Sequence, residues 1–366
     1  MTRALALLLA VVLAVLAPPA SAQLHVSLNE SASLGGDRGL VESGWSPAWL
    51  APAIVVYLRP DLGATTAIGP VTATGTTPPT VTISGTPTSI QTSYTTPYVE
   101  LDCTTPGILG TSKFTVKLNG STTATNVASA SSGVVLTGSG LTAGWAAGAS
   151  ATNDVYTANI IASALADQSG AGNGATQATA SLQPTYLGAG GGGIGAQACL
   201  ASNPAFTSYL NMGAAANVIV ATTAGERVIV AQNANDPPSG GATGLAETNW
   251  GSAAASANLP YTDGTIYDEF GISVRLNFTH AASLASPFLY DSTASQTTGL
   301  FLAFLDGTQI NSTAKSWGMS SSTPKIMGGS DNKTIWCEWI VVNRQLYGVE
   351  RAALNAYATN RYGANL

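Results

Sequence analysis

The chain has 366 residues, a mass of 36.8 kDa and a formal net charge of −6. Only 9% of its residues are charged, against about a quarter in an ordinary soluble domain, whereas 45% are hydrophobic. The length suffices for about two domains, and the scarcity of Lys and Arg argues against nucleic acid as a partner. The two histidines, His25 and His280, offer little material for a histidine-built metal site or general base.

The N-terminus has the pattern of a secretory signal peptide. An unbroken apolar run from Ala4 to Leu16 follows Arg3, and Ala20-Ser-Ala22 is the small-residue pattern that signal peptidase recognises. The run is short for a membrane-spanning helix, and no later run is long enough. We therefore predict a signal peptide over residues 1–22, a mature start near Gln23 and a secreted, extracellular protein without a membrane span; the alternative is a buried N-terminal helix.

The residues after the predicted signal peptide differ from it in composition and in hydrophobic pattern. Residues 23–46 are polar and irregular, which predicts an extended arm, and an apolar strand over residues 52–59 follows. Between residues 76 and 161, short alternating strands are separated by Gly and Ser. One of them ends in Asn119-Gly120, the pair that a type I′ hairpin turn favours. This spacing predicts a small β-sandwich.

The C-terminal part predicts further strands and one helix. Strands are expected at residues 217–222, 270–278 and 334–342, among others. Near the end the period becomes helical, with an expected apolar stripe and a stop at Gly363; the stripe consists of Leu346, Val349, Ala353 and Tyr357.

Four segments carry a family resemblance. The first, Leu165-Ala-Asp-Gln-Ser-Gly-Ala-Gly-Asn-Gly174 with Gln183-Pro-Thr-Tyr186, resembles the opening signature of concanavalin A-like, laminin-G-like jelly-roll domains. The other three resemble middle strands, the last strand and the closing helix of that family; they are residues 264–271, 304–309 and 338–363. Leu165 replaces the usual Trp, and Tyr347 replaces a helix-capping Ser.

The part of the chain that separates the jelly-roll segments is similar to immunoglobulin-like modules of phage virion and bacterial surface proteins. The similarity is carried by Pro79-Thr-Val-Thr-Ile-Ser-Gly-Thr-Pro87 and Gly138-Ser-Gly-Leu141. The resemblance implies an all-β chain: a concanavalin A-like jelly-roll sandwich with a short C-terminal helix, formed by residues 47–75 and 162–366 and interrupted by an immunoglobulin-like sandwich at 76–161. Insertion at an exposed loop costs little closure entropy.

Such a jelly roll can be a lectin or a glycoside hydrolase, and the sequence favours the lectin. A hydrolase needs two carboxylates across one cleft. The nearest match, Glu100-Leu-Asp102, lies in the inserted sandwich and is interpreted as solvent-facing. Asp268 and Glu269 are adjacent, which is poor geometry for an acid/base pair. We predict no enzyme and no catalytic residue.

Sugar binding needs aromatic platforms beside polar groups. The candidate ligand-binding residues are Trp250, Tyr261, Asp263, Tyr267, Asp268 and Trp317. The alternative is that the tryptophans are ordinary packing and that Tyr267 is core. Asp263 and Asp268 offer oxygens to Ca²⁺, but no loop with alternating carboxylates indicates a calcium site, so no cofactor is predicted and the metal content stays open.

Three cysteines remain after the predicted signal peptide. Cys199 and Cys337 both fall in the jelly-roll part, and export supplies oxidising conditions, so a disulfide between them is one hypothesis. The other is three buried thiols. Cys103 lies on an inward-facing strand position of the insert.

Together these features predict a secreted, non-catalytic surface or matrix attachment protein that binds a glycan or a cell-surface polysaccharide through its jelly roll. The rival hypothesis is a structural subunit of an extracellular or virion-like assembly, such as a fibre, coat or decoration protein, whose partners are copies of itself or neighbouring subunits. Low charge and faces rich in Ser, Thr, Ala and Gly suit such packing.

Overall fold

The structure is a computed structural model. It describes residues 53–76, 78–202, 208–213, 219–238, 244–248, 250, 256–319, 323–326 and 334–363. All of them belong to one compact unit, Glu42–Leu366. The predicted signal peptide and extended arm lie outside the described residues.

The larger part of this unit is built from antiparallel strands. Their bounds are β1 Ile54–Leu58, β2 Ala64–Ile68, β13 Ile160–Leu165, β14 Ala175–Thr176, β15 Thr185–Leu187, β16 Cys199–Ala201, β17 Leu210–Asn211, β18 Ala224–Asn233, β19 Leu245–Thr248, β20 Ser256–Leu259, β21 Ile266–Asp268, β22 Leu276–Phe278, β23 Phe288–Ser295, β24 Leu300–Leu305, β25 Thr308–Thr313, β26 Lys325–Ile326 and β27 Thr334–Val342. The helical segments are α2 Pro60–Gly63, the single 3₁₀ turns Ala180–Leu182 and Ile194–Ala196, and the C-terminal α4 Gly348–Tyr362.

These strands form one continuous ladder that surrounds a shared core as two layers. One layer runs β1–β27–β18–β23–β24–β25. The other runs from β2 and β13 through β14, β17, β26, β19, β20 and β21 to β22. Side chains of both layers, such as Ile229 and Trp339 from the first and Leu210 and Leu259 from the second, share one hydrophobic cluster. The predicted all-β fold of antiparallel sheets with a short C-terminal helix is therefore observed.

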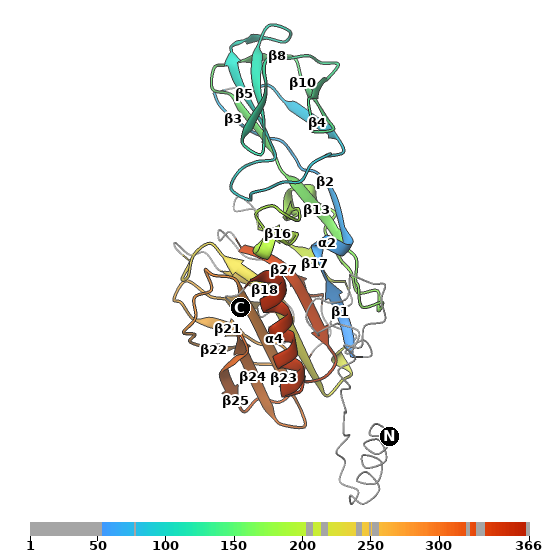
Figure 1. The fold of residues 1–366 in the computed structure, drawn as a ribbon, viewed down its shortest axis with the longest axis vertical. Coiled ribbons are helices and arrows are strands. Elements are labelled where there is room, and N and C mark those ends of the chain that lie inside the picture. Colours follow the sequence, from blue (N-terminus) through green and yellow to red (C-terminus); the bar gives the residue numbers. More distant parts are fainter. Residues whose placement is uncertain are drawn as a thin grey trace, which may run out of the picture. The chain divides into compact units, whose positions relative to one another are not determined.

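The outer face of the first layer carries a second core beneath α4 (Figure 1). All nine residues of β27 are buried because one face meets the sandwich interior and the other meets the helix. Leu354, Tyr357 and Ala358 of α4 pack in a cluster with Val228 and Ile340 of the sheet. An apolar run without alternation is what a strand covered on both faces requires.

The buried stripe of α4 differs from the predicted one. Leu346 and Tyr357 are buried as expected, but Val349 is 79% exposed. The buried face contains Arg351, which the sequence pattern placed outside the stripe. Its guanidinium bonds to Glu226 at 2.7 Å and to Asp291 at 2.5 Å, so two buried carboxylates compensate its charge. A stripe defined by hydrophobicity alone misses a paired charge.

The helix start is stabilised without a serine. The backbone N–H of Tyr347 donates to the Glu350 carboxylate at 2.8 Å, and Arg344 binds both oxygens of that carboxylate at 2.7 and 2.8 Å. This retains the glutamate half of a capping box, in which the N-cap N–H is satisfied by the side chain three residues later.

A disulfide joins Cys199 and Cys337, whose Cα atoms are 4.2 Å apart. Leu200 of β16 pairs with Trp336 of β27, which places the two cysteines directly opposite each other. Both belong to the cluster beneath α4. Cys103 is free and buried, as its inward strand position predicted.

The signature segment after Leu165 ties the first strand of the sandwich to its neighbours. Asp167 Oδ1 accepts the backbone N–H of Tyr57 and of Ser169, both at 2.9 Å, and its Oδ2 accepts that of Asn173 at 2.8 Å. Asn173 in turn donates to the carbonyl of Val55 at 2.7 Å. The polar turn therefore holds β1 by specific hydrogen bonds.

The inserted sandwich has its own core. Its strands are β3 Thr72–Thr74, β4 Val81–Gly85, β5 Val99–Thr105, β6 Gly107–Ile108, β7 Lys113–Leu118, β8 Ser121–Ala128, β9 Val134–Leu136, β10 Leu141–Trp145, β11 Ala149–Ser150 and β12 Val155–Ala158. They form the sheets β3–β12–β5–β7–β8, β4–β10–β9 and β11–β6 around a cluster that includes Phe114, Trp145 and Tyr156.

The sheet of the insert begins before the predicted boundary at residue 76, because β3 pairs with β12. All three residues of β3 are exposed, so this strand has no hydrophobic alternation that the sequence could reveal. Asn119 and Gly120 both have positive φ, 48° and 78°, as a type I′ turn between β7 and β8 requires.

Among the described residues, none of the helices has the length and apolar character needed to cross a membrane.

Candidate functional site

The structure separates the six predicted ligand-binding residues into two groups. Trp250, Asp268 and Trp317 are buried, with exposed fractions of 2%, 0% and 5%. Tyr261, Asp263 and Tyr267 reach the surface, and Tyr261 is 39% exposed. Only the second group is placed to meet a ligand from solvent.

The two tryptophans belong to the core, contrary to the prediction. The Trp250 ring lies 5.7 Å from that of Phe270 and 6.4 Å from that of Trp339, measured between centroids. The Trp317 ring stands edge-on to Phe270 at 5.9 Å and covers Gly225 and Gly271, where a Cβ atom would collide with it. The absence of side chains at these two glycines leaves space in the core for the Trp317 ring. The sequence pattern of aromatic and polar residues does not show this space, because the ring and Gly225 are far apart in the chain.

Asp268 is also a structural residue. Its Oδ2 accepts hydrogen bonds from Arg227 at 2.6 Å and from the Tyr290 hydroxyl at 2.7 Å, and its Oδ1 accepts the Phe270 N–H at 2.8 Å. Both oxygens are therefore used within the core, and this carboxylate is unavailable to Ca²⁺ or sugar. A buried ion pair of this kind destabilises the protein when one partner is lost.

The other three predicted residues gather on one surface with Arg275, which the sequence analysis missed. We call this set, Tyr261, Asp263, Tyr267 and Arg275, the tyrosine face. The two tyrosine rings lie 5.7 Å apart at an interplanar angle of 84°. The Tyr267 hydroxyl donates to Asp263 Oδ2 at 2.8 Å, and the Arg275 guanidinium lies 4.3 Å from the centre of the Tyr267 ring. One face thus combines two aromatic rings, a carboxylate and a cation.

A tight turn before β21 builds this arrangement. Gly264, with φ of 74°, donates its N–H to the carbonyl of Tyr261 at 3.0 Å, and Asp263 Oδ1 accepts the Thr265 N–H at 2.9 Å. An aspartate that closes its own turn is typical at such positions, and glycine supplies the positive φ. The turn therefore fixes Asp263 beside the tyrosine that follows in the strand.

The charges of the face are set by these contacts. Desolvation raises the pKa of Asp263, but hydrogen bonds from Thr265 and Tyr267 outweigh it, and the pKa lies below its ordinary value. The hydrogen bond to Asp263, with desolvation, raises the pKa of Tyr267 above its ordinary value. At neutral pH Asp263 is therefore ionised and Tyr267 keeps its proton.

Arg275 was missed because residues 270–278 were predicted as one strand. The structure instead has a turn there, and β22 begins at Leu276, opposite Asp268. Extending this register by one residue toward the turn would place position 275 across from Glu269. The position of Arg275 next to Tyr267 therefore depends on the pairing of β21 with β22, which the sequence does not show.

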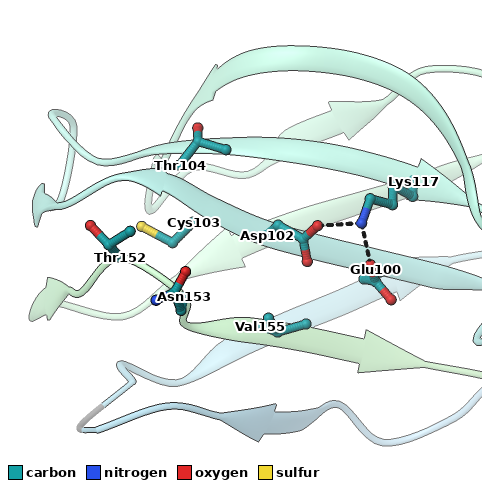
Figure 2. Close-up of a pocket in the computed structure, with 8 residues that line it drawn as sticks. All are labelled: Glu100, Asp102, Cys103, Thr104, Lys117, Thr152, Asn153 and Val155. Carbon is teal, nitrogen blue, oxygen red and sulfur yellow. Dashed lines mark hydrogen bonds and ion pairs between the residues drawn. The ribbon is translucent and has the colours of Figure 1, made fainter.

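The inserted sandwich carries a shallow pocket of about 570 Å³ (Figure 2). Lys117 lies between two half-exposed carboxylates, with Nζ 2.6 Å from Glu100 Oε1 and 2.5 Å from Asp102 Oδ2. The hydrogen bonds to Asp102 and Glu100 raise the pKa of Lys117 above its ordinary value. Glu100 and Asp102, the nearest match in the sequence to the carboxylate pair of a hydrolase, therefore both form ion pairs with one lysine.

Cys103 also lines this pocket, and Figure 2 shows its sulfur beside Thr152. Desolvation, followed by the negative charge of Asp154, raises the pKa of the thiol. A thiol that keeps its proton is a poor nucleophile, so the pocket holds one lysine shared by two carboxylates and an inert thiol.

Within the part of the chain that the structure describes, no three His, Cys, Asp or Glu side chains converge to hold a metal ion.

No family model matches the chain, and no curated protein sequence is significantly similar to it. Among solved structures, the chain is similar to the binding domain of Paraclostridial mosquitocidal protein 1, with 13% identity, 52% of this chain and 49% of that chain covered, and a TM-score of 0.39. It is similar to Trypanosoma rangeli sialidase, with 14% identity, 45% and 28% coverage and a TM-score of 0.36. A third similarity is to the binding domain of botulinum neurotoxin DC in complex with SialylT, with 12% identity, 54% and 49% coverage and a TM-score of 0.34.

The matched regions span less than half the length of those chains. At this level, the similarities carry no argument about activity, substrate or partner.

Proposed function

We propose that this protein is a secreted, non-catalytic attachment protein of the laminin-G-like jelly-roll class, with an inserted immunoglobulin-like module, and that it binds glycans at the tyrosine face. The observation that carries the proposal is the meeting of Tyr261 and Tyr267 with Asp263 and Arg275 on one accessible surface. The signal-peptide pattern of residues 1–22 supports secretion.

Each component of the face suits a sugar. The C–H side of a pyranose ring packs against an aromatic ring, and two rings at 84° offer one platform and one wall. The Asp263 carboxylate accepts hydrogen bonds from hydroxyl groups, and the Arg275 guanidinium donates to ring and hydroxyl oxygens. Tyr267 holds Asp263 in place by its hydrogen bond, so the acceptor is oriented before a ligand arrives.

The test is binding to a glycan array, with the Tyr261→Ala variant beside the wild type. Tyr261 has its side chain at the surface, so its loss should remove binding and leave the melting temperature nearly unchanged. Tyr347→Ala is the matched control, because Tyr347 is 66% exposed and also lies against an arginine, Arg344, at 5.3 Å. Trp250→Ala is unsuited as a binding test because it would damage the core.

Three results would count against the proposal: no glycan bound by the wild type, equal binding by the Tyr261→Ala and wild-type proteins, or release of p-nitrophenol from aryl glycosides, which would make the protein a hydrolase.

The alternative, a subunit of an extracellular assembly, is favoured by one observation. Large apolar side chains are exposed on the insert, with Val135 at 73% and Ile108 at 64%. Light scattering of the purified protein would show large oligomers in that case, and their loss in a Val135→Ser/Ile108→Ser variant would locate the contact.

A further inference from the structure

Glu269 stands out beside the tyrosine face because it is buried and has no partner. Its exposed fraction is 2%, and neither carboxylate oxygen accepts a hydrogen bond. Buried polar groups in proteins are nearly always hydrogen-bonded, so a bare carboxylate calls for an explanation. The adjacent Asp268 shows the usual solution, since both of its oxygens are satisfied.

The position of Glu269 connects it to the tyrosine face. It follows the end of β21, two residues after Tyr267, and successive side chains of an extended chain alternate between faces. Continuation of the β21–β22 register from Asp268 and Leu276 places it across from Arg275. Yet Arg275, which is exposed, lies over the Tyr267 ring instead of closing on the carboxylate.

Burial disfavours the ionised form of this carboxylate. Desolvation, reinforced by the charge of Asp268 and opposed by Arg275 and Arg227, raises the pKa of Glu269 to about 7. A glutamine would fill the same space without the cost of a buried charge. Residues that weaken their own surroundings in this way concentrate at binding sites.

We propose that Glu269 is a ligand-binding residue of the tyrosine face and that its two oxygens accept hydrogen bonds from two adjacent hydroxyl groups of a sugar. This inference rests on the proposed glycan binding. It goes further by naming the acceptor and the ligand chemistry, because a carboxylate with both oxygens free can accept one hydrogen bond from each hydroxyl of a vicinal diol. Because Glu269 is 2% exposed, the ligand reaches it when the side chains that cover it move aside.

The proposal carries a pH dependence. The ionised carboxylate accepts two hydrogen bonds, whereas the protonated form loses part of that capacity. The charged and titratable groups facing Glu269 are Asp268 beside it, Arg227 of β18 and Arg275 across the hairpin. Of these, Asp268 and Arg227 neutralise each other in their ion pair. Affinity should therefore rise as the pH increases through about 7.

The experiment measures binding of the methyl pyranosides of glucose, galactose and mannose by saturation-transfer NMR and titration at pH 5.5 and pH 8. The variant is Glu269→Gln, and Glu100→Gln on the inserted sandwich is the matched control. We expect Glu269→Gln to weaken binding about tenfold or more at pH 8, as loss of hydrogen bonds to a charged acceptor does, and to remove the pH dependence. Glu100→Gln should bind as the wild type does.

Monodeoxy analogues of the bound glycoside locate the diol, because removal of either hydroxyl should weaken binding to the wild type but have little further effect on Glu269→Gln. Wild-type affinity and pH dependence in Glu269→Gln would overturn this inference and leave the glycan proposal intact, provided that Tyr261→Ala still loses binding. If the wild type binds no glycoside, both fall.

Discussion

Two regions of this molecule bury carboxylates, and they treat them in opposite ways. Beneath α4, Glu226 and Asp291 are both bound by Arg351, and the Leu346 N–H donates to Glu226 at 2.6 Å. Beside the tyrosine face, Glu269 is equally buried but has no hydrogen bond. The first arrangement holds a helix to a sheet, whereas the second costs stability and is open to an external donor.

The region beneath α4 also shows how two carboxylates share one cation. Desolvation and the neighbouring Asp291 raise the pKa of Glu226 well above its ordinary value. The positive charge of Arg351, which contacts both carboxylates, opposes that rise. Burial is therefore common to the two regions, and they differ in that Glu226 and Asp291 are paired with an arginine whereas Glu269 accepts no hydrogen bond.

The largest expected effect is loss of the disulfide beneath α4. Cys199 and Cys337 are 138 residues apart, and a cross-link closing so long a loop stabilises by about 4 to 5 kcal/mol in the chain-entropy model. The Cys199→Ala/Cys337→Ala variant should lose about that much free energy of unfolding, measured by urea denaturation. Intact mass of the wild type should rise by about two daltons on reduction, from the two hydrogens added to one bond.

Cys103→Ala serves as the control for that experiment, since this thiol is free. Alkylation of three thiols in the denatured, unreduced protein would contradict the disulfide.

The next effect comes from the arginine that links the two carboxylates. Arg351→Met removes the cation and leaves Glu226 and Asp291 buried together, which should cost about 3 to 5 kcal/mol. Arg344→Met is the matched control, because its pair with Glu350 is partly exposed and should be worth under about 1 kcal/mol. Equal losses of unfolding free energy in the two variants would show that the cluster does not hold α4.

The sequence predicted well where burial follows from hydrophobicity. The β27 strand lies at residues 334–342 as expected, and the β7 hairpin has its predicted turn. Prediction failed where a tertiary partner decides the position of a side chain. Arg351 is buried by carboxylates from β18 and β23, distant in sequence, and Trp317 is buried over Gly225 and Gly271.

The candidate site shows the same division. Tyr261, Asp263 and Tyr267 lie within seven residues of one turn, so local sequence could group them. Arg275 and Glu269 join them only through the pairing of β21 with β22. The sequence interpretation weighed Glu269 only as a partner of Asp268, and nothing local distinguishes a satisfied carboxylate from a bare one.

The smallest expected effect is a gain of stability on replacing Glu269, whereas the changes beneath α4 cause losses. The pKa of Glu269 is about 7 in the folded protein and 4.5 as its ordinary value, so the folded state binds this proton more tightly than the unfolded state. The resulting stabilisation is complete below pH 4.5 and is lost as the pH rises to about 7. Glu269→Gln cannot ionise, so at pH 8 it should be more stable than the wild type by roughly 1 to 3 kcal/mol, the usual cost of an unsatisfied buried group.

At pH 4.5 the two proteins should unfold at nearly the same urea concentration. Other buried carboxylates, such as Glu226 and Glu338, titrate in both proteins and cancel in the difference. A variant less stable than the wild type at pH 8 would mean that Glu269 has a partner within the fold, and the contrast with the cluster beneath α4 would disappear.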